Sequence, residues 1–225
     1  MKKTFTLLAL VLCSPLLVSL FSSCSTQGFI SSVTRNDIQQ MTQFETLANV
    51  GTIESGNKIV YNDSLTEISK ALFATELNND KTLPISEVFL TEDSIINNKI
   101  QYEIYFIMTC LERNIKPKDI PVPPTVDSIL CSRNERFGVL AYNWGFTRST
   151  GNYAGQVAKG IALGILSMGA IYTVPYKDMA RNGIIVVDAK NHNLAYVTTI
   201  ARESSPLEAK TYKKQVRDLL KKFKK

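Results

Sequence analysis

The sequence predicts an α/β domain built on a single small mixed sheet, with an α+β arrangement as the alternative, and three patterns favour this class. Segments with apolar residues three and four apart alternate with short β-branched runs. Helix-capping signals precede several of the periodic segments. Near the carboxyl end, two β-branched runs and a polar turn come before one more periodic segment. We therefore expect a carboxyl-terminal hairpin followed by a closing helix.

Length and composition fit one globular domain. The 225 residues are 44% hydrophobic and 20% charged, which is enough to bury one sizeable core. We expect a signal peptide at 1–23, a tether at 24–33 and a single domain at 34–225. Removal of Lys2 and Lys3 lowers the formal charge from +6 to +4. Arginine and aromatic residues are not clustered together, so the charge does not predict nucleic-acid binding.

The amino terminus is organised as a secretory signal. A positive head, Met1-Lys2-Lys3, precedes an almost unbroken apolar run from Phe5 to Phe21. The run is shorter than the roughly 20 residues that span a bilayer as a helix, and Pro15 would kink it. A cleaved signal is therefore favoured over a permanent membrane helix.

The segment Leu20-Phe21-Ser22-Ser23-Cys24-Ser25 resembles the lipobox of bacterial lipoproteins, although Phe21 stands where leucine is usual. The resemblance implies cleavage before Cys24, a diacylglyceryl group on its thiol and acylation of the new terminal amine. Because no aspartate or acidic run follows Cys24, it also implies an outer-membrane position facing the periplasm. The alternative is a plain secretory signal, with Cys24 an ordinary thiol. Cys13 lies too early for cleavage.

The first part of the domain is predicted to hold two helices and one strand. A Thr34 cap and apolar residues about three apart predict a short helix as far as Leu47. Thr52 to Tyr61 is predicted to be extended around a Ser55-Gly56-Asn57 turn. Ser64 and Glu67 form a capping-box pattern that opens a second helix.

The middle of the chain continues this alternation. We expect a strand from Ile85 to Leu90 and a long helix from about Glu92 to Arg113. Pro117 to Pro124 is the clearest internal break, which we interpret as a connection inside one domain. A short helix at 126–131 and a strand at 136–148 follow, and the strand places Trp144 and Phe146 on the same parity as Leu140 and Tyr142.

The last elements are a hairpin and a helix. Gly183 to Asp188 and Leu194 to Ala201 are joined by a polar turn, and Ser205-Pro206-Leu207-Glu208 predicts the start of the closing helix. Its expected core stripe consists of Leu207, Tyr212, Val216, Leu219, Leu220 and Phe223. The opposite face is basic, with Lys210, Lys213, Lys214 and Arg217. This face is expected to be solvated, with anionic lipid as the alternative partner.

A glycine-spaced segment at about 151–176 has no charge between Lys159 and Lys177. It lacks the spacing of a phosphate-binding loop. Three interpretations remain: a helix over the sheet, an interfacial membrane contact, or a pore-forming insertion in an oligomer. Gly160, Gly164 and Gly169 are the candidate membrane or oligomer contacts, because a helix places the first two on one edge.

Candidate catalytic chemistry is sparse. His192, the only histidine, falls in a predicted hairpin turn between two asparagines, so we assign no catalytic residue. Cys110 and Cys131 either pair as a disulfide or are two buried thiols. Neither histidine count nor cysteine spacing predicts a metal site. Glu92 and Asp93 fit the first turn of a helix. The covalent lipid on Cys24 is the only group expected, with no cofactor.

The order of elements resembles the α/β lipoprotein domains of the curli-secretion channel subunit, the TolB amino-terminal domain and the outer-membrane activators of penicillin-binding proteins. The residues behind this are 58–62 leading to 64–66, and 184–188 followed after a turn by 194–197. The segment at 151–176 and the proline-rich stretch depart from that pattern. The resemblance implies a periplasmic binding or assembly module and carries no functional residue.

The sequence therefore favours a non-enzymatic envelope lipoprotein. It is expected to hold the membrane through its lipid and to bind an envelope protein or a cell-wall component, but not nucleic acid. The alternative is a subunit of an oligomeric secretion or pore complex, and an envelope hydrolase is the third hypothesis.

Overall fold

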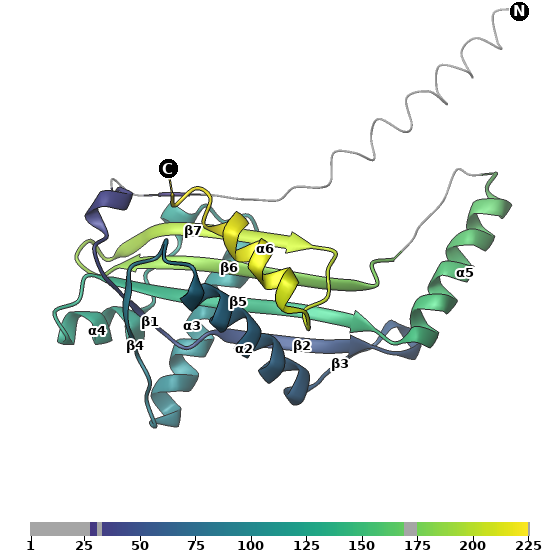
Figure 1. Cartoon of the computed structure of the whole chain (residues 1–225), viewed down its shortest axis with the longest axis horizontal. Coiled ribbons are helices and arrows are strands. Elements are labelled where there is room, and N and C mark those ends of the chain that lie inside the picture. Colours follow the sequence, from purple (N-terminus) through teal and green to yellow (C-terminus); the bar gives the residue numbers. More distant parts are fainter. Residues whose placement is uncertain (1–27, 31–32, 169–174, 225) are drawn as a thin grey trace, which may run out of the picture.

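A computed structural model describes residues 28–30, 33–168 and 175–224, and within them the chain forms five α-helices and a seven-stranded mixed sheet (Figure 1). Helices cover both faces of the sheet. Cys24, Cys13 and Gly169, which carried earlier predictions, lie outside the described residues. The predicted fold class, with a terminal hairpin and a closing helix, is confirmed.

The sheet is organised around one long strand, β5 (Phe137–Arg148). On one side, β5 pairs in parallel with β1 (Met41–Gln43) near its start and with β2 (Leu47–Ile53) farther along. On its other side, it pairs antiparallel with β6 (Asp178–Asp188) over its whole length. The remaining strands are peripheral: β3 (Ile59–Tyr61) on β2, β4 (Ile85–Val88) on β1, and β7 (Asn193–Arg202) on β6.

Two pairs of helices enclose the sheet. α2 (Asp63–Asn79) and α6 (Ala209–Leu219) pack on one face. α3 (Ser94–Glu112) and α4 (Pro124–Ser132) pack on the other. Figure 1 shows α2 and α6 in front of the strands and α3 behind them. Each face has its own apolar core, centred on Phe73, Val139 and Tyr212 in the first case and on Phe44, Ile104 and Leu140 in the second.

A buried polar network holds α2 and α6 to the sheet. The Nδ2 of Asn143 on β5 donates to the Ser69 Oγ at 2.9 Å and to the Tyr212 hydroxyl at 2.9 Å. The Tyr212 hydroxyl in turn donates to the Pro206 carbonyl at 2.8 Å. Burial raises the pKa of Tyr212, so its hydroxyl keeps its proton and remains a donor.

The helix predicted from Thr34 to Leu47 is wrong. Thr34 and Asp37 do cap a single 3-10 turn, Arg35–Asp37, but β1 and the start of β2 follow. Ile38, Met41 and Phe44 are all buried, as a helical spacing of three would also require. The backbone of this segment is satisfied by β4 and β5 instead, and strands buried on both faces lack the alternation that would have identified them.

Two helix starts also differ from their predicted caps. In α2 the N-cap is Asn62, whose side chain accepts from the Leu65 amide at 3.0 Å, so Ser64 lies inside the helix. The closing helix begins at Ala209, after the Ser205-Pro206 pattern. Its core stripe is confirmed, because Tyr212, Val216, Leu219, Leu220 and Phe223 are buried, with Leu207 only half-buried.

The segment after β5 forms α5 (Thr150–Leu166), which does not pack over the sheet. Figure 1 shows it projecting from the end of β5, away from the body of the domain. Of the three interpretations of this segment, a helix over the sheet is therefore wrong for its described part. Its base is fixed by Asn152, which donates to the Glu54 carbonyl at 2.6 Å.

Candidate functional site

An aromatic surface, made by Tyr61, Tyr105 and Trp144, lies where three elements meet on the α3 side of the sheet. The Trp144 ring of β5 contacts the Tyr61 ring of β3 edge-on, with ring centroids 5.9 Å apart. On its other side, the Tyr105 ring of α3 lies 6.5 Å away. Tyr61 and Tyr105 are 49% and 45% exposed, so their rings are largely available to a partner.

The strands position this surface through close packing below it. Trp144 lies opposite Asn49 of β2 and Arg181 of β6. Two residues back along β5, on the same face as Trp144, the Tyr142 ring lies against Gly183, where a Cβ would approach the ring to 2.2 Å. Only glycine allows this contact, and the resulting burial raises the pKa of Tyr142. Trp144 therefore lies next to the buried, closely packed pair of Tyr142 and Gly183.

Charged side chains border the aromatic surface. Arg181 forms an ion pair with Glu112 at the end of α3, and the Arg148 guanidinium lies 5.7 Å from the centre of the Phe146 ring. Exposed tyrosine and tryptophan rings bordered by arginine are the composition enriched in protein interfaces. The arrangement offers contact area and hydrogen-bonding edges, with no group positioned as a nucleophile or base.

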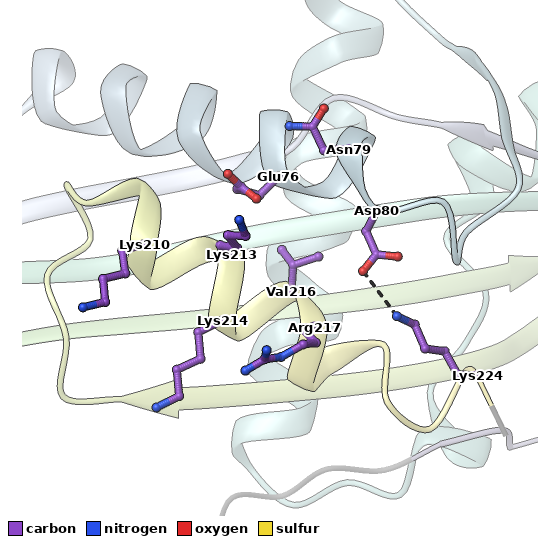
Figure 2. Close-up of a pocket in the computed structure, with 9 residues that line it drawn as sticks. All are labelled: Glu76, Asn79, Asp80, Lys210, Lys213, Lys214, Val216, Arg217 and Lys224. Carbon is purple, nitrogen blue, oxygen red and sulfur yellow. Dashed lines mark ion pairs between the residues drawn. The ribbon is translucent and has the colours of Figure 1, made fainter.

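A basic groove of about 580 Å³ lies on the opposite side of the sheet, between α2 and α6 (Figure 2). α6 contributes Lys210, Lys213, Lys214 and Arg217, and Lys224 follows from the turn beyond it. Glu76 and Asp80 of the α2 side oppose these cations, and Lys224 pairs with Asp80 at 3.6 Å. Positive charge predominates, so the groove favours an anionic ligand or surface.

The chemistry-bearing residues singled out in the sequence are scattered. His192 is exposed in the hairpin turn, with its Nδ1 2.8 Å from an Asp127 carboxylate oxygen. Cys110 is buried, Cys131 is exposed, and both are free thiols in the structure. Gly160 is buried and Gly164 half-buried on α5. Asp93 caps α3 by accepting from the Ile95 amide at 2.8 Å, so it has a structural role.

The described residues contain neither a cluster of metal ligands nor a membrane-spanning helix. They hold no group of three or more histidine, cysteine, aspartate or glutamate residues placed to share a metal ion. None of the helices in the described part is both long enough and apolar enough to cross a membrane.

Sequence reasoning did not identify the aromatic surface. The parity of β5 places Trp144 on one face, but Tyr61 and Tyr105 come from segments that meet it only through tertiary packing. Tyr61 is brought in by the register of the β2–β3 pair, in which it lies opposite Gly51. Local periodicity carries no signal for such a meeting.

The structure defines a three-layer α/β domain with an aromatic surface on one side of a mixed sheet and a basic groove on the other. No model of a known protein family and no curated protein matches the chain. Among solved structures, the PelC dodecamer from Paraburkholderia phytofirmans aligns with a TM-score of 0.38 and 7% identity, covering 88% of this chain and 94% of that one. The LpoB C-terminal domain from Salmonella enterica aligns with a TM-score of 0.29 and 7% identity, covering 77% and 87%.

Proposed function

We propose that this protein is a non-enzymatic envelope lipoprotein, attached to the outer membrane through lipid on Cys24, that binds another envelope protein through its aromatic surface. The observation that carries the proposal is the pair of exposed tyrosine rings, Tyr61 and Tyr105, packed against the half-buried Trp144. The ion pair of Arg181 with Glu112 lies beside them. Rigid aromatic rings supply most of the binding energy in many protein interfaces. The lipobox-like sequence supports the anchor.

Site-specific photocrosslinking tests the binding surface in intact cells. A photoreactive phenylalanine replaces Tyr61 or Tyr105 in turn, and Thr75, which is exposed on α2 across the sheet, is the matched control. We expect one adduct of defined mass from the two tyrosine positions and none from Thr75. Adding Tyr105→Lys to the Tyr61 variant should remove the adduct, because it places a charge among the rings. Equal adducts at all three positions would contradict the proposal.

Two further measurements test the anchor and the absence of catalysis. The intact mass of the membrane-extracted protein, compared with a Cys24→Ala variant, should show a chain that begins at Cys24 and carries acyl groups. A soluble, unlipidated wild type would reject the anchor. Turnover of an ester, peptide or glycan substrate that a point substitution abolishes would show that the chain is a hydrolase instead.

A second function, a subunit of an oligomeric secretion or pore complex, is favoured by the surface of α5. Near its free end, Ile165 and Leu166 are 73% and 81% exposed, and Met168 just beyond the helix is 97% exposed. Apolar side chains on a projecting helix need a partner, either lipid or another chain. The native mass of the detergent-extracted protein separates the two functions, since a stable ring supports the second and a monomer contradicts it.

A further inference from the structure

The chain joins the folded domain beside the end of α6. Gly28, Phe29 and Ile30 run along the free edge of β7, where the Ile30 amide donates to the Ala195 carbonyl at 3.0 Å and the Val197 amide to the Gly28 carbonyl at 3.2 Å. The Phe29 ring packs against the Phe223 ring with centroids 5.4 Å apart. The first described residues are therefore fixed to the carboxyl-terminal turn, in place of the free tether that the sequence predicted there.

This junction limits how far the proposed lipid lies from the domain. Gly28 is only four residues after Cys24, and a fully extended chain of that length reaches about 14 Å. A bilayer that holds acyl chains on Cys24 must therefore come close to Gly28. A Cβ at Gly28 would lie 3.5 Å from the Cδ of Lys222, so the side chain of this lysine runs beside the junction.

The region around the junction is positively charged. We call the following residues the anchor-side basic cluster: Arg35, Arg217, Lys221, Lys222 and Lys224. Arg35 belongs to it because its guanidinium lies 5.2 Å from the centre of the Phe223 ring. Among the described residues, three side-chain carboxylates lie on the same elements or turns as these cations, or pair with one of them: Asp37, Asp80 paired with Lys224, and Asp218 paired with Arg202 at 2.7 Å. The five cations of the cluster outnumber these three carboxylates. The cations of the basic groove continue the positively charged surface along α6.

We infer that the anchor-side basic cluster lies against a bilayer containing anionic phospholipid and orients the domain on it. The inference rests on the proposed lipid anchor, which brings the cluster within reach of headgroups. Attraction between lysine and an anionic surface extends over roughly 8 Å at physiological ionic strength, so only cations held close to the surface contribute. Lys222 is the cation of this cluster whose side chain runs directly beside the junction at Gly28.

Lysine footprinting on the lipidated protein tests the inference. The protein is inserted into phosphatidylcholine vesicles with or without phosphatidylglycerol, treated with an amine-acetylating reagent, and analysed by mass spectrometry. We expect Lys221 and Lys222 to be acetylated more slowly with phosphatidylglycerol present, and high salt to restore the rate. Lys58, which is exposed just before β3, and Lys99, which is exposed on α3, should be acetylated at the same rate on both kinds of vesicle. Equal rates for all four lysines on an acylated protein would overturn the inference, whereas a mass without acyl groups would reject the anchor instead.

Vesicle binding by the unacylated mature chain provides the second measurement. A Lys221→Glu/Lys222→Glu variant and the charge-matched Lys58→Glu/Lys99→Glu control have the same net charge. Partitioning onto phosphatidylglycerol vesicles at low salt should fall about thirty-fold or more in the first variant, since each lysine near the surface contributes a few-fold. The control should retain most of its binding. Equal losses in both variants would show that only total charge matters, and no binding by the wild type would likewise overturn the inference.

Discussion

The side chain of Tyr212 is the point at which α2, α6 and β5 are joined by hydrogen bonds. Its hydroxyl contacts Ser69 and Asn143 and donates to Pro206, and all of its ring is buried. We expect Tyr212→Phe to lower the free energy of unfolding by about 1–2 kcal/mol, because the Pro206 carbonyl loses this donor and the buried Asn143 amide loses one of its acceptors. Chemical denaturation measures the change. Tyr105→Phe, on an exposed tyrosine, should have almost no effect, and equal stability of the two variants would contradict this account.

Glu45, in the turn between β1 and β2, is a carboxylate whose contribution to the stability of the fold depends on pH. A side-chain hydrogen bond from Lys70 of α2 lowers its pKa below the usual 4.5. A depressed pKa in the folded state stabilises the protein above the unfolded pKa, and the effect disappears as the pH falls through the folded value. The stability difference between wild type and Lys70→Met should therefore be largest near neutral pH and vanish in acid. Lys99→Met should show no such trend, and a difference that grew in acid would have the wrong sign.

Leu219 tests the placement of the closing helix on the core. Its side chain is fully buried among the apolar residues of α6 and β7. Leu219→Asp should destabilise the whole domain by roughly 3 kcal/mol or more, because a charge is buried without a partner. Lys213→Glu/Lys214→Glu, on the exposed face, should change stability little. An unchanged melting temperature for Leu219→Asp would show that this helix does not cover the core.

At the level of elements, the sequence was most informative where a pattern was long. The apolar spacing from Glu92 to Arg113 predicted α3 within two residues at the start and one at the end. The hairpin was also recovered, although β6 begins at Asp178, five residues before the predicted start. The short strand β1 was not predicted, because it is defined by backbone pairing with β4 on one edge and β5 on the other. Non-local pairing of this kind leaves no local periodicity.

The position of α5 could not be predicted from its apolar composition. Packing over the sheet was one interpretation of its apolar composition. In the structure, however, the side chains of Ile165 and Leu166 near its carboxyl end are exposed. The double substitution Ile165→Glu/Leu166→Glu should therefore leave the melting temperature nearly unchanged, because exposed positions contribute little to stability. If α5 forms an oligomer contact, the same variant should shift the native mass to that of a monomer. A large fall in melting temperature would show that this end of α5 is packed in solution.

For the whole molecule, the candidate surfaces were less predictable than the layers. The basic face of α6 follows from helical periodicity alone, and the sequence identified it. Its significance depends on Gly28 lying beside Lys222, which is a contact between the two ends of the domain. The aromatic surface depends in the same way on long-range register. Residue types and helix faces were thus accessible from the sequence, while their meeting required the sheet.

The central position of β5 also determines when the chain can fold. β1 and β2 are synthesised early, but both pair in parallel with β5, which is synthesised later. Leu47 of β2, for example, cannot pair until Tyr142 of β5 has been synthesised. The amino-terminal half therefore has no complete sheet of its own while the rest is being synthesised. A chain truncated after Asn134 should show no cooperative thermal transition, and a sharp one would contradict this order. Delayed folding would suit the export that we propose for this chain, because a translocation channel accepts an unfolded chain more readily than a folded domain.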